Sequence, residues 1–362
     1  MDKLIEVVNR ESDYHRVNTF YSTPELYTQE KHRESLTWSL KRDDFVPICQ
    51  NNPEPTQGHK FWAGFFSSRS SLKYHHRRAS SYLQAARKLQ WQAALPLRLH
   101  VNETELDAFT ADDTDLSPLA SAVALMTHHD AITGTEKQFV ADDYAYRMSR
   151  AAAIADRVTS HALRVLIGEP GDVSLVRCPD MNASSCHLSS QSGLERFTVV
   201  VYNPMGRPRA IPVRLPIADA DTASTISVTS SGAEVRSAVL PAPPVTRLQR
   251  AGLPRDTAKQ LLVFEADVPA LAARTFTVHR HSAKPLPFAE APPPPPSSSV
   301  LENSHLRVEF GDDGLIASIE DKASGLRTKL SQSWRYYVAD SRGPAASTHI
   351  KQASGAYMFR PE

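Results

Sequence analysis

The sequence predicts a multidomain α+β protein in which helices come first and antiparallel strands follow. Up to about residue 168, apolar residues recur every three or four positions. From about residue 197 they alternate with polar residues. A run of five prolines then separates this alternating part from a last hairpin pattern. With 362 residues, the chain is long enough for two or three domains of roughly 150 residues each.

Composition excludes several classes of protein. The chain has 41 Lys and Arg residues and 40 Asp and Glu residues, which gives a net charge of +1. This charge does not favour nucleic acid or an anionic membrane as a partner. Hydrophobic residues make up 41% of the chain and charged residues 22%, which excludes wholesale disorder. No uninterrupted apolar stretch approaches the roughly 18 residues of a membrane-spanning helix. The opening segment MDKLIEVVNRES lacks the apolar block of a secretory signal peptide.

Helix and short strand alternate in the first sixty residues. The apolar residues at positions 4–8 predict an entering helix, residues 17–24 predict a strand that ends at proline, and residues 25–35 have a helical pattern. A long helix is predicted from about residue 70 to residue 92. Its core-facing positions are Leu72, Ala79, Leu83, Ala86 and Leu89.

A second helix of a bundle is predicted to begin at Ser117. Its hydroxyl is placed to cap the helix, and Pro118 stands at the first helical position, where a missing N–H costs nothing. The pattern continues through Leu119, Val123 and Met126, and it predicts that the helix ends at His128 and His129.

A third helix follows a short loop at residues 132–134. Thr135 and Gln138 have the spacing of a capping box, so the helix is expected to begin at Thr135. Gly168 and Pro170 are expected to end it. One apolar stripe runs along it, formed by Val140, Tyr144, Met148, Ala151, Ala155, Val158, Ala162 and Val165.

Beyond Cys186 the apolar period changes to two, which predicts antiparallel strands. Residues 291–299 predict a stiff polyproline linker, and residues 305–321 predict a hairpin with its turn at positions 312–314, Asp-Asp-Gly. Five earlier segments alternate in this way, namely residues 197–204, 210–217, 225–230, 260–269 and 274–281.

The cysteines indicate an oxidising compartment. Cys178 and Cys186 bracket the loop CPDMNASSC, in which Asn182 begins a glycosylation triplet, and Asn102 begins another. A disulfide and a glycan would both need the secretory route. Two unpaired cysteines in a surface loop are the alternative, and the residues alone leave both open. The third cysteine, Cys49, has no evident partner.

The clearest candidate site is the run His128-His129-Asp130. Imidazoles are zinc ligands, and Asp130 could orient one of them or bind a substrate hydroxyl. The alternative is that the helix dipole alone favours histidines at a helix end. A zinc site also needs three or four ligands, and the chain has no HExxH or CxxC motif to supply the others.

A second candidate is the acidic pair Asp43-Asp44, which precedes Phe45. A carboxyl group beside an aromatic surface can have a raised pKa and act as a general acid, whereas an ordinary solvated turn is the alternative. The aromatic block at residues 61–66 could stack on a sugar or pack in a core. The basic stretch at residues 73–88 fits the solvated face of a bundle helix, and the near-zero net charge agrees.

At residues 128–144, HHDAITGTEKQFVADDY, the chain strongly resembles the class II α-mannosidases of glycoside hydrolase family 38, and among them the lysosomal acid type. The resemblance implies the end of a (β/α) catalytic domain, a three-helix bundle and antiparallel β-sandwich domains. Further blocks match in the same order at residues 2–9, 20–27, 36–45, 61–69, 178–186, 197–207 and 352–362.

The resemblance also implies a division of the chain into domains. Residues 1–58 would be the C-terminal part of the catalytic domain, and residues 59–170 the middle helical bundle. Residues 171–290 would be the first β-sandwich domain. After the linker at residues 291–299, residues 300–362 would begin a larger, mutarotase-like C-terminal β-sandwich.

The activity implied by the resemblance is zinc-dependent removal of terminal α-linked mannose from N-glycans, with retention of configuration, in the lysosome or the secretory pathway. His129 would ligate zinc and Asp130 would contact mannose hydroxyls. Asp44 would be the acid/base residue, with Asp43 in its place if the register differs by one. Cys178 and Cys186 would form a family disulfide, and Asn182 would carry a glycan.

Departures from the family pattern lead to a further expectation. The family's H-x-D zinc motif and its nucleophilic Asp precede the block with which this chain begins, so Met1 corresponds to an internal position. Of the four family zinc ligands only His129 is present, so the chain is expected to be an inactive part of the enzyme that needs the missing catalytic portion or a homo-oligomer. The alternative is a non-catalytic glycan-binding or interaction protein. Cys49 stands where an aromatic residue is expected.

Overall fold

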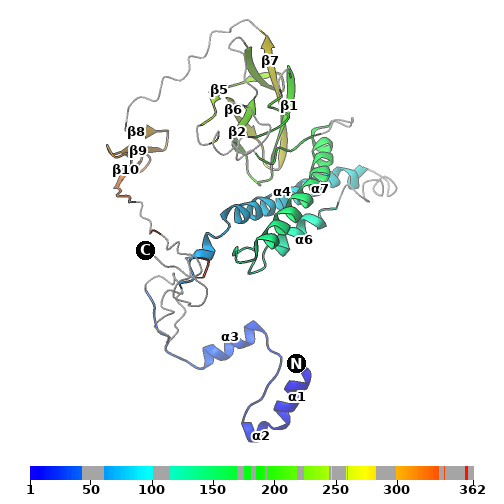
Figure 1. The fold of residues 1–362 in the computed structure, drawn as a ribbon, viewed down its shortest axis with the longest axis vertical. Helices are drawn as coiled ribbons and strands as arrows, with labels where there is room; N and C mark the ends of the chain where they lie inside the picture. Colours follow the sequence, from blue (N-terminus) through cyan, green and yellow to red (C-terminus); the bar gives the residue numbers. More distant parts are fainter. Residues whose placement is uncertain are drawn as a thin grey trace, which may run out of the picture. The chain divides into compact units, whose positions relative to one another are not determined.

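The computed structural model describes residues 1–42, 61–100, 115–168, 175–180, 185–191, 194–217, 224–243, 246, 258, 260–282, 299–333, 338 and 355–357. The chain divides into two units, Met1–Ile48 and Cys49–Glu362. Helices precede three antiparallel sheets (Figure 1), so the predicted α+β class is confirmed. Among the described helices, none combines the length and the apolar character that a bilayer crossing requires.

Residues 1–42 of the first unit form three short helices: α1 (Asp2–Arg10), α2 (Ser12–His15) and α3 (Pro24–Arg33). Both predicted helices are therefore present, and the Thr23 hydroxyl caps α3 by accepting a hydrogen bond from the Leu26 amide at 3.2 Å.

The strand predicted at residues 17–24 is wrong. The described part of this unit has no strand with which these residues could pair. Instead, the Asn9 side chain bonds the Thr19 backbone. Its amide donates to the Thr19 carbonyl at 2.8 Å and its oxygen accepts from the Thr19 N–H at 2.7 Å. An extended segment with high strand propensity needs a neighbouring strand, and without one the local bonds to α1 decide its path.

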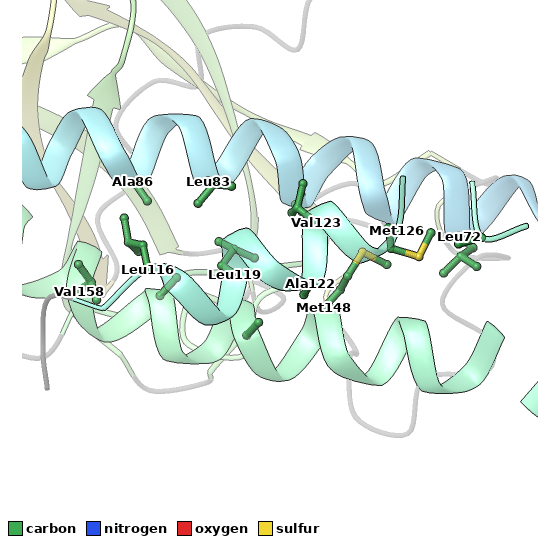
Figure 2. Packing of buried hydrophobic residues seen from close by; sticks show 14 of the residues in the cluster. Leu72, Leu83, Ala86, Leu116, Leu119, Ala122, Val123, Met126, Met148 and Val158 are labelled. Atoms are coloured by element: carbon green, nitrogen blue, oxygen red, sulfur yellow. The ribbon is translucent and has the colours of Figure 1, made fainter. Parts of the chain in front are cut away.

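In the second unit, the short 3-10 helix η2 (Gly64–Phe66) precedes a helical bundle of α4 (Ser70–His100), α6 (Ser117–Leu125) and α7 (Gln138–Ile167). Figure 2 shows their buried side chains meeting between the three helices. Leu119, Met126 and Met148 are almost fully buried there. Gly168 ends α7 in the left-handed region at φ 71°, as predicted. All five positions predicted to face the core from α4 are buried: Leu72, Ala79, Leu83, Ala86 and Leu89.

The predicted cap of α6 is wrong by one residue. Leu116 occupies the N-cap position, Ser117 is the first helical residue, and no side chain caps the helix. The Ser117 N–H donates to the Asp115 carboxylate at 2.7 Å. Leu116 is buried in the bundle core, so its packing places it at the helix start ahead of the serine.

Both helix ends that flank the histidine run also differ from the prediction. Helix α6 ends at Leu125, and turns occupy residues 126–134, so His128 and His129 lie beyond the helix. Helix α7 begins at Gln138, after Lys137 at the N-cap. The Thr135 hydroxyl bonds Asp130 and does not cap α7.

A β-sandwich follows the bundle. Its two sheets have the strand orders β1-β7-β3-β4 and β2-β6-β5. Phe197, Ile217, Phe264 and Phe276 are buried between them. All five predicted strands are confirmed. The strands are β1 (Arg196–Asn203), β2 (Arg209–Ile217), β3 (Ser224–Ser230), β4 (Ala233–Val235), β5 (Ser237–Pro241), β6 (Gln260–Val268) and β7 (Ala272–Ser282).

Strand β2 lies at one end of its sheet and pairs antiparallel with β6 from Arg209↔Val268 to Ile217↔Gln260. It contains two prolines, Pro212 and Pro216, which are four residues apart. Proline has no N–H to donate, so within a sheet it is confined to edge strands and bulges. The prolines therefore fit the position of β2 at the sheet edge.

A third sheet of strand order β11-β10-β9-β8 lies near the end of the chain. It confirms the predicted hairpin, in which Gly314 supplies the left-handed φ of 75° that the turn needs. The predicted polyproline linker at residues 291–299 lies outside the described residues, except for Ser299. The strands are β8 (Val300–Glu302), β9 (Leu306–Phe310), β10 (Ile316–Asp321) and β11 (Leu326–Lys329).

Helix α4 joins the bundle to the sandwich. The Tyr202 hydroxyl of β1 donates to Gln92 at 2.5 Å, and Gln92 donates in turn to the Leu271 carbonyl. Lys88 donates to the Pro204 carbonyl at 3.1 Å. Leu89, Ala93 and Ala162 form a small buried cluster beside Tyr202, so apolar packing accompanies the polar contacts.

Candidate functional site

The run His128-His129-Asp130 lies in the turns between α6 and α7. The Asp130 carboxylate is 3.3 Å from Nε2 of His128 and 4.0 Å from Nε2 of His129. The two imidazole rings are 4.4 Å apart between centroids. The His129 side chain is 85% exposed, whereas His128 and Asp130 are about half exposed. The three donor groups thus converge at the surface, where a ligand can reach them.

Hydrogen bonds within the loop orient Asp130. The Thr135 hydroxyl donates to its carboxylate at 3.0 Å, and the Thr135 N–H donates to its carbonyl at 3.1 Å. The Thr133 hydroxyl bonds both the Thr135 hydroxyl and the His129 carbonyl. These bonds fold the loop back on itself, so that the carboxylate faces the two imidazoles.

The N-terminal end of α4 holds this loop from the other side. Ser68 donates to the Gly134 carbonyl at 2.8 Å, Lys73 donates to the Ile132 carbonyl at 2.7 Å, and Arg69 donates to the Glu136 carbonyl at 2.9 Å. Burial lowers the pKa of Lys73, and the nearby Glu136 carboxylate partly offsets that effect.

Gly134 allows the close approach of this loop to α4. Its φ is +69°, and a Cβ atom there would lie 2.5 Å from the Ser68 carbonyl oxygen. Any other residue would therefore meet both a strained backbone conformation and a steric clash. The close approach of the loop to α4 thus requires a glycine at this position of the sequence block AITGT.

Aromatic residues from two distant segments meet next to α4. The Phe65 N–H donates to the Ala356 carbonyl at 3.1 Å, and Gly64 leaves room for the backbone of Gly355. Trp62 and Tyr357 pack edge to face at 5.0 Å and are 37% and 44% exposed. The aromatic block at residues 61–66 is therefore not simply core. The contact with Tyr357 was missed by sequence reasoning, because nearly the whole chain separates the two residues.

The chain is similar in sequence to known α-mannosidases. A family model described as the alpha mannosidase middle domain matches residues 60–166. The lysosomal alpha-mannosidase of Felis catus is 35% identical over 373 residues, covering 100% of this chain and 33% of that protein. The human lysosomal alpha-mannosidase is 34% identical over 367 residues, with 100% and 33% covered.

Over its whole length the chain is similar to α-mannosidases. It spans about a third of the length of the curated relatives that it matches. A solved α-mannosidase structure from Enterococcus faecalis is also similar, with a TM-score of 0.46, 15% identity, and coverage of 100% of this chain and 38% of that one. The predicted resemblance to the class II α-mannosidases, of the lysosomal type, is confirmed.

Cys178 and Cys186 form a disulfide, with their Cα atoms 5.1 Å apart. The disulfide lies beside a cavity of about 410 Å³ between the bundle and the sandwich. At the cavity wall, Arg177 donates to both carboxylate oxygens of Asp156, at 2.5 and 3.2 Å, and stacks on the ring of Tyr82. The Tyr82 hydroxyl also donates to Asp156, at 2.6 Å.

Several predicted site residues lie outside the described residues. These are the acid/base candidates Asp44 and Asp43, the glycosylation candidates Asn182 and Asn102, and Cys49. Their assignments stay predictions. His129 and Asp130 lie together in the loop, while the assignment of zinc and mannose to them is likewise a prediction.

Proposed function

We propose that this chain is part of an α-mannosidase that removes terminal α-linked mannose from N-glycans with retention of configuration. The observation that carries the proposal is the convergence of His128, His129 and Asp130 within the block that resembles the family most strongly. In this proposal His129 ligates zinc, Asp130 binds mannose hydroxyls, and Asp44, or Asp43, is the acid/base residue.

The donor set of the loop fits zinc. Each of the three residues offers one ligand atom, these atoms lie within 4.8 Å of one another, and imidazole nitrogen and carboxylate oxygen are common zinc ligands. Zinc in a glycosidase of this kind would polarise and hold sugar hydroxyls. Zinc sites usually have three or four protein ligands, and no further histidine, cysteine or carboxylate joins this cluster among the described residues.

In this proposal, the orientation of the Asp130 carboxylate suits it to bind the substrate. Thr135 donates to one carboxylate oxygen and leaves acceptor capacity for sugar hydroxyls. A carboxylate with a fixed orientation binds a vicinal diol with little loss of side-chain entropy. The exposed aromatic pair Trp62 and Tyr357 offers an apolar surface of the kind on which a sugar ring stacks.

A retaining glycosidase needs a nucleophilic carboxylate in addition to the acid/base residue. Our residue assignments in this chain supply an acid/base candidate and a single zinc ligand. We therefore propose that the 362-residue chain does not hydrolyse mannosides by itself. It would need a catalytic portion that carries the nucleophile and the remaining ligands.

The proposed location is the lysosome or the secretory pathway. The disulfide between Cys178 and Cys186 supports this location, because disulfides persist in oxidising compartments. The similarity to lysosomal α-mannosidases supports it as well. The domain division at residues 58, 170, 290 and 299 also belongs to this proposal. The family model for the middle domain covers residues 60–166 and supports the second part of that division.

The test combines zinc binding with mannoside hydrolysis. We expect calorimetry to detect zinc binding to the purified chain. Binding should fall at least about tenfold in His129→Ala, a loss of about 1.4 kcal/mol, and stay unchanged in the exposed control His187→Ala. A fluorogenic α-mannoside should not be hydrolysed. Hydrolysis that Asp44→Asn abolishes would show that the chain is complete for catalysis. Mannose binding that survives His129→Ala without zinc would instead favour the non-catalytic glycan-binding alternative.

A further inference from the structure

Glu136 is an unusual carboxylate next to the candidate site. It lies directly after Thr135, and its side chain is only 4% exposed. Among the described residues, neither of its carboxylate oxygens receives a hydrogen bond. Its nearest cation is Arg69, whose Nε lies 3.4 Å from Oε1 without hydrogen-bond geometry. Burying a carboxylate is costly unless its charge is offset, so its presence needs a reason.

The reason lies in the two cations that hold the loop. Arg69 donates to the Glu136 carbonyl and to the Gln138 side chain, at 2.9 and 2.6 Å. Lys73 donates to the Ile132 carbonyl, and burial disfavours its charged form. The Glu136 carboxylate is the negative charge that acts on Lys73 and contacts Arg69. It thus offsets part of the cost of burying the Lys73 charge, and it lies against the Arg69 guanidinium where both cations meet the loop backbone.

Two sets of contacts connect Glu136 to the candidate site. The cations fix the loop carbonyls at residues 132 and 136, and Ser68 fixes the carbonyl at residue 134. Thr135 lies between the fixed carbonyls of residues 134 and 136. It donates to Asp130 through both its N–H and its hydroxyl. A displacement of the loop at Glu136 therefore moves the Asp130 carboxylate and the neighbouring imidazoles.

We propose that Glu136 is a positioning residue for His129 and Asp130, acting through Arg69 and Lys73. The effect of Glu136 on zinc and mannose binding rests on the proposed function. Its effect on the position of the loop does not. Glu136 touches neither ligand in this proposal, and it differs in that respect from His129 and Asp130.

The test compares Glu136→Gln and Glu136→Asp with the control Asp143→Asn. Asp143 lies in α7, the helix that follows Glu136; its side chain is 47% exposed and pairs with Arg147. The histidine rings of the isotope-labelled chain would be followed by NMR, with His128→Gln and His129→Gln for assignment. We expect Glu136→Gln to shift the His128 and His129 ring signals and to speed amide exchange of residues 131–135 at least about tenfold. The control should change neither.

A role in general stability would give a different result. It would speed exchange in the sandwich and throughout α7 as well, without a selective effect on the loop. Glu136→Asp keeps the charge and should restore most of the wild-type ring signals, which also guards against failure of the Gln variant to fold. Unchanged ring signals and loop exchange in Glu136→Gln would overturn the proposal, and so would failure of Glu136→Asp to restore them.

Zinc titration separates this inference from the proposed function. If the wild-type chain binds zinc, Glu136→Gln should weaken binding by about tenfold and Asp143→Asn should leave it unchanged. If the wild-type chain does not bind zinc, the proposed metal site fails. The NMR and exchange comparison then still decides whether Glu136 positions the loop.

Discussion

Replacing Asp156 by asparagine should loosen the junction between the bundle and the disulfide loop by about 2 kcal/mol. The carboxylate accepts hydrogen bonds from Tyr82 of α4 and, at both oxygens, from Arg177. A fully buried pair that loses one partner costs about 3–5 kcal/mol, and an exposed pair about 0–1 kcal/mol. The side chains of Asp156 and Arg177 are 30% and 31% exposed, so an intermediate value is expected.

Hydrogen exchange is the suitable assay, because a chain with several domains need not unfold in one step. Amides of α7 around residue 156 should lose about 2 kcal/mol of protection in the variant, a roughly thirtyfold faster exchange. Asp143→Asn on the same helix removes an exposed i, i+4 pair and should cost about 0.3–0.5 kcal/mol. Equal effects of the two variants would refute the reasoning, because the junction would then behave as an ordinary surface.

The same cluster predicts a dependence on pH. Burial first, and then the hydrogen bond to Asp156, raise the pKa of Tyr82 above its usual 10.0. A group whose pKa is raised by folding stabilises the fold below its unfolded pKa and loses that contribution as the pH rises further. Stability of the bundle should therefore fall above about pH 10, and fall less steeply in Asp156→Asn. Urea unfolding of both proteins between pH 8 and pH 11 would show this.

Three further predictions concern stability. Leu119→Ala should cost about 2–5 kcal/mol, measured by exchange of bundle amides, because the side chain is fully buried in the core of Figure 2. Gly134→Ala should cost more than Gly168→Ala in the same assay. Both glycines have positive φ, but only a Cβ at Gly134 meets other atoms. Opening the disulfide by Cys178→Ser with Cys186→Ser should cost about 2.5 kcal/mol, read from thermal unfolding, as expected for a loop of sequence separation 8.

Three outcomes would contradict these expectations. The exposed control Leu125→Ala should stay within about 0.5 kcal/mol, so a cost equal to that of Leu119→Ala would speak against the bundle core as described. Equal costs at the two glycines would mean that the loop does not press against α4. A double serine variant as stable as the wild type would mean that the disulfide constrains nothing.

Periodicity predicted the elements that have a single buried face. The five core positions of α4 and the strands at residues 197–204 and 260–269 are present as predicted, because one apolar face of each packs into one core. The strand predicted at residues 17–24 failed for the complementary reason. Its residues favour a strand, but the described part of its unit offers no neighbouring strand.

The helix ends could not be read from the sequence. Ser117 and Thr135 both have capping chemistry, but neither caps a helix. The Thr135 hydroxyl has a competing partner in Asp130, five residues earlier, and only the folded loop brings the two together. Likewise, the resemblance picked out His129 and Asp130, while the contacts of Ser68, Arg69 and Lys73 with their loop depend on the packing of α4.

The prolines of β2 bear on how copies of this chain can associate. An exposed sheet edge is a template on which a strand from another molecule can add, and this is a common route to aggregation. Pro212 and Pro216 lie on the same side of β2 because they are four residues apart, and neither has an N–H to donate. Pro216 is buried, and its carbonyl accepts a hydrogen bond from the Ser189 hydroxyl at 2.6 Å. Both features oppose the addition of a strand from another molecule at β2. A high protein concentration should therefore not convert this edge into a fibril seed.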